Sequence, residues 1–113
     1  QGIVVSHHHG IMKYAVPPIM ILPEIIKSTK GKMTVFVDCC IETGMDAFKC
    51  LALGADGICV GRALMEPLKN FGATGVSSTI NSNTDELKGV MAKTGFKNTK
   101  QIESSVIHRV HLI

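Results

Sequence analysis

Short apolar runs alternate with longer segments of helical period along this chain. Three of the runs are β-branched and lack polar alternation, which is typical of strands buried on both faces of a parallel sheet. We predict these strands over residues 2–6, 33–38 and 57–60. In the segments that follow them, apolar residues recur at helical spacing. We predict helices there over residues 19–29, 45–53, 64–71 and 85–93.

Punctuating residues support these boundaries. Gly31 and Gly54 follow two of the predicted helices as stop signals, and the start of the last helix has three candidate N-cap residues. These candidates are Asn81, Asn83 and Thr84. Strand and helix therefore alternate three times with short connections, the pattern of right-handed β/α units on a parallel sheet. We predict one α/β domain over residues 1–113, with C-terminal helices after the third unit.

The composition of the chain argues against several classes of function. At 113 residues and 45% hydrophobic content, the chain suits one packed domain. Its 12 basic and 9 acidic residues are scattered, and it has one Tyr and no Trp, so nucleic acid is not an expected partner. The chain has no run of 18 apolar residues, so we do not predict a membrane span. The four cysteines, in a chain without a signal peptide, predict a reduced cytoplasmic protein.

Three clusters of unusual composition follow the three predicted strands. They are residues 6–10, residues 38–44, and the pair Gly61 and Arg62. Ligands of parallel α/β sheets bind at the carboxyl ends of the strands. Because all three clusters would lie on that one rim, the sequence predicts a ligand site there.

Two of these clusters suit a phosphate ligand. Gly61 and Arg62 would offer backbone N–H groups at a helix start and a guanidinium. Asp38 would accept a hydrogen bond from a ligand hydroxyl while the amides of its turn face a phosphate. Each also has a structural interpretation: Arg62 as a surface residue of a tight turn, and Asp38 as a cap of the turn or of the following helix.

The third cluster holds His7, His8 and His9. An imidazole of near-neutral pKa can take a proton from a bound substrate. Three consecutive side chains on an extended chain diverge, so a metal site would need partners such as His108 or His111. The cysteines show no C-x-x-C spacing, and we expect no metal site. Solvated loop histidines or the remnant of a tag are the alternative interpretation.

Four stretches of the chain resemble the FMN-dependent 2-hydroxy acid oxidases and dehydrogenases, the family of glycolate oxidase and lactate oxidase. The stretches are G-I-V-V-S-H-H-H-G at 2–10 with L-P-E-I at 22–25, V-F-V-D-C-C-I at 35–41, F-K-C-L-A-L-G-A-D through V-G-R at 48–62, and M-A-K-T-G at 91–95. The third is the most specific. Together they extend the resemblance over residues 2–108.

The resemblance implies the C-terminal part of a TIM (β/α)8 barrel, a fold of about 250 residues when whole. It implies FMN as cofactor and oxidation of a small (S)-2-hydroxy acid, such as lactate or glycolate, to the 2-oxo acid. We expect the chain alone to be inactive, with the remainder of the barrel or further copies of itself as partners.

The resemblance also implies residue roles. His8 matches the base that assists removal of the substrate's hydroxyl or Cα proton. Ser6 matches a flavin contact and Asp38 the ribityl contact. The phosphate loops correspond to Cys39, Cys40, Gly61 and Arg62.

Several positions depart from the family pattern. Ile11 stands where an Arg grips the substrate carboxylate, which leaves Lys13 as the nearest substrate-binding cation and a poorer clamp. Cys39 and Cys40 replace two glycines, and Glu42 replaces a phosphate-binding Arg. These departures predict either a divergent subgroup with a different substrate grip or weak FMN affinity.

Two other interpretations stay open. One is another phosphate-binding TIM barrel, such as a flavin-dependent isomerase or a dehydrogenase of nucleotide precursors, although these lack the V-S-x-H strand followed by L-P-E. The other is a non-catalytic relative that only packs against a partner. Three β/α units leave two open sheet edges, so the isolated chain is expected to be marginal or oligomeric.

Overall fold

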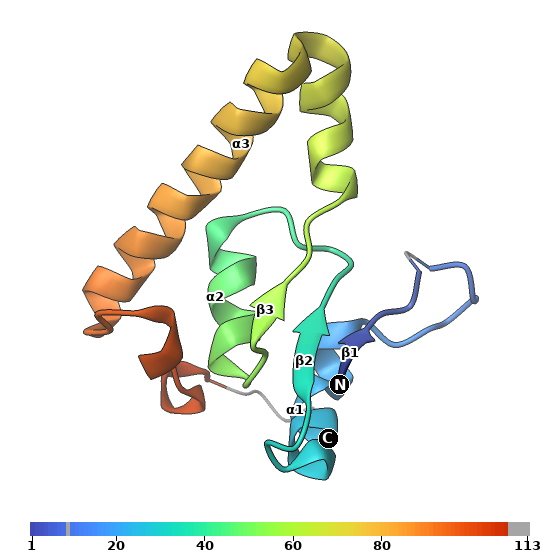
Figure 1. Ribbon diagram of the computed structural model, residues 1–113, viewed down its shortest axis with the longest axis vertical. Helices are drawn as coiled ribbons and strands as arrows, with labels where there is room; N and C mark the ends of the chain where they lie inside the picture. Colours follow the sequence, from blue (N-terminus) through green and yellow to red (C-terminus); the bar gives the residue numbers. More distant parts are fainter. Residues whose placement is uncertain (9, 109–113) are drawn as a thin grey trace.

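The computed structural model of the chain describes residues 1–8 and 10–108 and contains one parallel sheet with helices (Figure 1). The strands are β1 (Gly2–Val5), β2 (Thr34–Val37) and β3 (Gly57–Ile58), in the order β1-β2-β3. The helices are α1 (Pro18–Thr29), α2 (Gly44–Ala52) and α3 (Met65–Thr94), with short 3-10 turns η1 (Arg62–Leu64), η2 (Thr99–Gln101) and η3 (Ser104–Val106). The predicted α/β arrangement with parallel strands is confirmed.

The main core lies between the sheet and the first two helices. Val35 and Val37 of β2 are almost fully buried there together with Leu22 of α1 and Cys50 of α2. Val5 of β1 joins the same cluster, and it lies in register with Val37. Because successive side chains of a strand alternate between faces, α1 and α2 cover the face that carries these valines.

The opposite face of the sheet is open. Val4 is 52% exposed and Phe36 is 41% exposed, and β1 and β3 are the edge strands of the sheet. The prediction that the strands are buried on both faces is therefore wrong for the described part of the chain. The physical reason is that no helix or strand among residues 1–8 and 10–108 packs on this side, although the strands carry apolar residues for it.

Helix α3 differs most from the prediction. It forms two arms joined at Gly72, whose φ of 61° and ψ of −147° break the helical path (Figure 1). Residues 73–84, expected to be non-helical, belong to the second arm. Gly75 of the second arm packs closely against Pro67 of the first arm, since a Cβ at residue 75 would overlap the carbonyl oxygen of Pro67. Tertiary packing thus overrides the weak helix propensity of a Ser-, Thr- and Asn-rich segment.

The predicted N-caps of the last helix are also wrong. Asn81, Asn83 and Thr84 all lie inside the second arm of α3. The Thr84 hydroxyl donates to the carbonyl oxygen of Ile80 at 2.8 Å, which is how a Thr within a helix satisfies its side chain. Asn83 instead reaches another element, which is described below.

A second core cluster fixes α3 against α2. Phe48 and Ala52 of α2 are buried with Met91 of α3 and Ile102, which follows η2. The rings of Phe48 and Phe96 are 6.3 Å apart between centroids and tilted by 40°, a favourable aromatic arrangement. The C-terminal segment therefore contributes, with Phe96 and Ile102, to the packing of α3 against α2.

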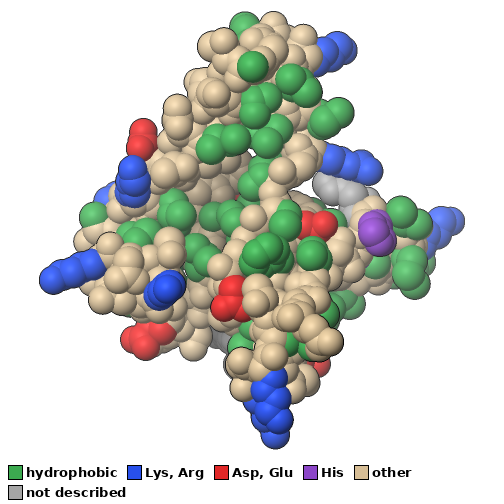
Figure 2. All heavy atoms as spheres, in the orientation of Figure 1, with side chains coloured by type: hydrophobic (Ala, Val, Ile, Leu, Met, Phe, Trp, Pro, Cys, Tyr) green, Lys and Arg blue, Asp and Glu red, His purple; other side chains and the backbone are tan. Residues whose placement is uncertain are grey.

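The outer surface of α3 is rich in exposed apolar residues. Figure 2 shows hydrophobic side chains gathered over both arms, and Met65, Leu68, Phe71 and Ile80 are each about half exposed or more. Polar residues interrupt this surface throughout. In the part of the chain that the structure describes, no helix combines the length and apolar character needed to cross a bilayer.

Candidate cofactor and substrate site

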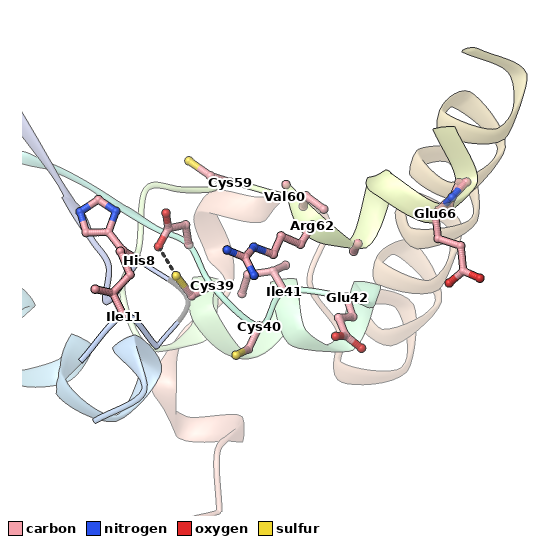
Figure 3. A pocket seen from close by; sticks show the side chains of 14 residues that line it. His8, Ile11, Cys39, Cys40, Ile41, Glu42, Cys59, Val60, Arg62 and Glu66 are labelled. Carbon is pink, nitrogen blue, oxygen red and sulfur yellow. Dashed lines mark hydrogen bonds between the residues drawn. The ribbon is translucent and has the colours of Figure 1, made fainter. Parts of the chain in front are cut away.

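A cavity of about 820 Å³ lies at the carboxyl ends of the three strands (Figure 3). Its walls come from the β1–α1 loop, from the turn of residues 38–44 between β2 and α2, hereafter the cavity turn, and from the segment that joins β3 to α3. The three clusters that follow the predicted strands therefore meet at one place. The lining residues are His8, Ile11, Asp38, Cys39, Cys40, Ile41, Glu42, Cys59, Val60, Gly61, Arg62, Ala63, Glu66 and Pro67.

Ser6, Asp38 and Cys59 form one row across the ends of the strands. The parallel ladder continues to this row, because the Asp38 amide donates to the Val5 carbonyl at 3.2 Å and the Cys59 amide to the Val37 carbonyl at 2.9 Å. Val5 and Val37 belong to the buried core, so the residues after them face the other side of the sheet. Sequence reasoning missed Cys59 because it lay inside the strand predicted over residues 57–60, whereas β3 ends at Ile58.

The Asp38 carboxylate is the electrostatic centre of this row. Cys39 Sγ donates to Asp38 Oδ1 at 2.9 Å, and Ser6 Oγ lies 3.5 Å from Cys39 Sγ. Burial by itself raises the pKa of Asp38. Hydrogen bonds from Cys39 and Ser6 and the charges of His8 and His7 lower the pKa by more than burial raises it, so the pKa lies below its ordinary value. Asp38 is therefore an ionised acceptor at neutral pH.

Cys39 and Cys40 have left-handed backbone conformations, with φ of 68° and 60°. A side chain with a Cβ pays about 1–2 kcal/mol for this conformation, which glycine adopts freely. The strand thus ends at Val37 and does not continue through these residues. Glycine at either position would form the cavity turn without this penalty.

Gly61 and Arg62 form the opposite wall of the cavity. The Leu64 amide donates to the Gly61 carbonyl at 2.9 Å and closes the turn. A Cβ on Gly61 would meet nothing within 4 Å, so the backbone there borders open space. Figure 3 shows the Arg62 guanidinium extending back across the cavity, while the Glu42 carboxylate points away from it. This wall presents a cation and an accessible backbone to a ligand.

The β1–α1 loop brings His8 to the cavity. Its amide donates to Ser6 Oγ at 3.1 Å, and its φ of 49° turns the chain sharply. The loop also places Ile11 in the lining, whereas Lys13 is exposed and is not a lining residue. His9 lies outside the described residues.

The histidines and cysteines do not assemble into a metal centre in the described ranges 1–8 and 10–108. No three side chains of His, Cys, Asp or Glu converge there as ligands. His111, one of the partners considered from the sequence, lies outside those ranges.

Glu66 and Pro67 also line the cavity, at the start of the first arm of α3. Sequence reasoning missed both. Only the fold reveals them, because they lie in α3 and not directly after a strand. Among the described lining residues, Asp38, Glu42 and Glu66 supply three carboxylates against one guanidinium, so the position of Arg62 decides where an anion can bind.

Comparison with known proteins gives consistent matches over nearly the whole chain. Residues 1–109 match the family model described as FMN-dependent dehydrogenase. Glycolate oxidase from Spinacia oleracea is 37% identical over 107 residues, which are 94% of this chain and 29% of that protein. L-lactate oxidase from Lactobacillus jensenii is 37% identical over 112 residues, which are 98% of this chain and 28% of that protein.

Solved structures agree with the sequence matches. Mandelate oxidase with benzoyl-formic acid superposes with a TM-score of 0.87 at 36% identity, covering 91% of this chain and 31% of that chain. A mandelate oxidase variant with a monooxide FMN adduct gives the same TM-score and identity. The chain thus spans a little less than a third of the relatives that it matches.

Proposed function

Because this chain belongs to the family of FMN-dependent dehydrogenases, we propose that it is the C-terminal part of a flavoprotein that oxidises small (S)-2-hydroxy acids to 2-oxo acids. FMN is the cofactor of the family. Glycolate, lactate and mandelate oxidases among the similar proteins point to substrates of this class. The cavity at the strand ends, with His8 and Arg62 in its lining, is the observation that carries the proposal to this chain's own residues.

The proposed whole fold is a (β/α)8 barrel to which this chain contributes its last three units. The TM-score of 0.87 over about a third of the mandelate oxidase chain supports this arrangement. So does the open face with Val4 and Phe36, because the inner side of a barrel is closed by the remaining strands. The remainder of the barrel is therefore the proposed partner for this face, and the chain alone is expected to associate with copies of itself.

The residues of the cavity fit FMN. Its volume of about 820 Å³ lies within the usual range for cofactor sites. Gly61 and Arg62 would hold the phosphate, and the Asp38 carboxylate would accept from a ribityl hydroxyl. Ser6 does not line the cavity, but it lies in the same row as Asp38 and is proposed to contact the flavin. When bound, the flavin accepts the two electrons that leave the substrate.

His8 is proposed as the base that takes the hydroxyl or Cα proton of the substrate. It lines the cavity, and its charge contributes to the lowered pKa of Asp38, so the two groups interact electrostatically. The protein thereby supplies a proton acceptor next to the cofactor.

Lys13 is proposed to bind the substrate carboxylate when the β1–α1 loop moves toward the cavity. Ile11 lines the cavity and offers no charge, and Lys13 is the next cation along the loop. An ammonium on a flexible stem grips a carboxylate more loosely than a guanidinium. Lys13→Ala is therefore expected to raise KM more than it lowers kcat.

The test uses the full-length protein that contains this chain. Its visible spectrum should show bound flavin that bleaches anaerobically with lactate or glycolate. His8→Ala should keep the flavin and lose the bleaching. Colourless wild-type protein would instead favour a non-catalytic relative, with Cys39, Cys40 and Glu42 as the first causes to examine. Bound flavin that no 2-hydroxy acid bleaches would favour another flavin-dependent barrel enzyme.

A further inference from the structure

The cavity turn is fastened at its C-terminal end by side chains from the second arm of α3. Glu86 Oε2 accepts a hydrogen bond from the Gly44 amide at 2.6 Å. Asn83 Nδ2 donates to the carbonyl oxygen of Glu42 at 3.0 Å. These partners are 42 and 41 residues apart in the sequence, so the two contacts are tertiary.

The backbones of α3 and α2 also touch at this point. Gly44, the first residue of α2, is buried. A Cβ on it would overlap the carbonyl oxygen of Asn83, the amide nitrogen of Leu87 and the side chain of Glu86. The two hydrogen bonds are therefore held by close packing, and α3 cannot shift here without moving the end of the cavity turn.

Starting α2 does not require this contact. Thr43 and Asp46 form a capping box in which Thr43 Oγ1 accepts from the Asp46 amide at 3.1 Å, and Asp46 Oδ2 accepts from the Thr43 amide at 3.1 Å. Asp46 Oδ2 also accepts from the Glu42 amide at 3.1 Å. Because local side chains already cap the helix, the contacts from Asn83 and Glu86 have another consequence, which is to tie the turn to a distant element.

The N-terminal half of the cavity turn has an unfavourable backbone conformation. Cys39 and Cys40 both occupy left-handed conformations that are unfavourable for residues with a Cβ. The surrounding structure must therefore hold these two residues in a conformation that they do not favour on their own. A firm anchor at Glu42 and Gly44 restricts the turn to the conformation that lines the cavity.

We propose that Asn83 and Glu86 are positioning residues of the cofactor site: from α3 they hold the cavity turn in the shape that receives the phosphate end of FMN. This inference rests on the proposed function of the cavity. Neither residue lines the cavity, so each acts through the turn. Glu86 adds a negative charge at the N-terminus of α2, which strengthens its hydrogen bond to the Gly44 amide.

The experiment compares Glu86→Ala, Glu86→Gln and Asn83→Ala in the full-length protein, with Asp85→Ala as the matched control. Asp85 is the neighbouring exposed carboxylate on the same helix. FMN affinity is measured by quenching of flavin fluorescence, and the motion of residues 38–44 by amide hydrogen exchange without flavin. Glu86→Ala is expected to weaken FMN binding about tenfold and to speed exchange in the cavity turn about tenfold. Glu86→Gln should restore part of both, since an amide oxygen still accepts the bond.

Several outcomes decide the inference. Faster exchange confined to the cavity turn, together with weaker FMN binding in Glu86→Ala but not in Asp85→Ala, would support it. A lower melting temperature with unchanged FMN affinity would reduce both residues to helix-packing roles and overturn it. If the wild type binds no FMN, the proposed function fails instead, and hydrogen exchange alone then judges the anchor: unchanged exchange of the turn would refute it.

Discussion

Two regions of this molecule use the same kind of residue under opposite conditions. In the core between the sheet and the first two helices, Cys50 is fully buried and burial raises the pKa of its thiol to about 11, with the nearby Asp46 charge adding to the shift. At the strand-end cavity, Cys40 is exposed and holds a left-handed backbone. One thiol fills space, and the other lines a cavity at some cost in conformation.

The difference shows where stability and function are placed in this fold. Among the described residues, no polar or charged side chain is buried and no buried side-chain polar atom lacks a hydrogen-bond partner. The cavity instead gathers three carboxylates, a guanidinium, an imidazole and three thiols at the end of the same sheet. The core supplies the rigidity that lets the cavity hold groups which would be unfavourable inside it.

Thiol reactivity should show the largest contrast between the two regions. At neutral pH, N-ethylmaleimide should label Cys40 in the flavin-free full-length protein more than a hundredfold faster than Cys50. The pKa of about 11 lowers the thiolate fraction of Cys50 about a hundredfold relative to a thiol of pKa 9.0, and burial blocks access further. Mass spectrometry of labelled peptides over time measures both rates. Comparable rates would mean that the core opens readily.

Truncation of the core should cost stability without a specific effect on the cavity. Leu22 is fully buried under the sheet, and Leu22→Ala is expected to lower the free energy of unfolding by about 2–5 kcal/mol. Chemical denaturation of the full-length protein measures the loss. FMN affinity, measured where the variant is still folded, should change little. A large loss of affinity under those conditions would mean that the two regions are not separable.

Relief of backbone strain at the cavity should have the opposite sign. Cys40→Gly is expected to raise the free energy of unfolding by about 0.5–1 kcal/mol, because the left-handed penalty exceeds the entropic cost of glycine. Cys39→Gly is a less clean test, since Cys39 Sγ also donates to Asp38. Denaturant titration compares the two variants with wild type, and destabilisation by Cys40→Gly would argue against strain in the turn.

The smallest expected effect is a dependence of stability on acid pH. Because the folded-state pKa of Asp38 lies below its ordinary value of 3.8, the ionised group stabilises the folded state at neutral pH, and this contribution is lost as the pH falls below that value. The stability difference between wild type and Asp38→Asn should therefore be constant from pH 7 to about pH 5 and shrink near pH 3. A difference that grows on acidification would contradict the assignment.

The strands and the first two helices were predictable because periodicity and turn residues agree there. Residues 2–6 and 33–38 were expected as strands, and β1 and β2 occupy nearly these positions. The same agreement holds for α1 and α2. The convergence of the three strand ends also followed from sequence, since parallel strands end at one rim.

Residues 73–84 of the second arm of α3 were not predictable as helix, because their Ser, Thr and Asn residues favour caps and turns over helix interiors. Packing on α2 decides the conformation of this arm, and with it the contacts of Asn83 and Glu86 to the cavity turn. No local pattern connects residues 41 or 42 positions apart. The burial of only one sheet face was missed for a related reason, since the sequence of a strand does not say which elements cover it.

The proposed assignment of the cavity is tested most directly by titrating FMN into the full-length wild-type protein and its Arg62→Ala variant, with flavin fluorescence as the signal. Among the described residues that line the cavity, Arg62 is the only Arg or Lys. We expect saturable binding to the wild type and an affinity about a hundredfold weaker in the variant, as for the loss of hydrogen bonds to a charged group. Equal affinities, or no binding by the wild type, would contradict the assignment of this cavity to FMN.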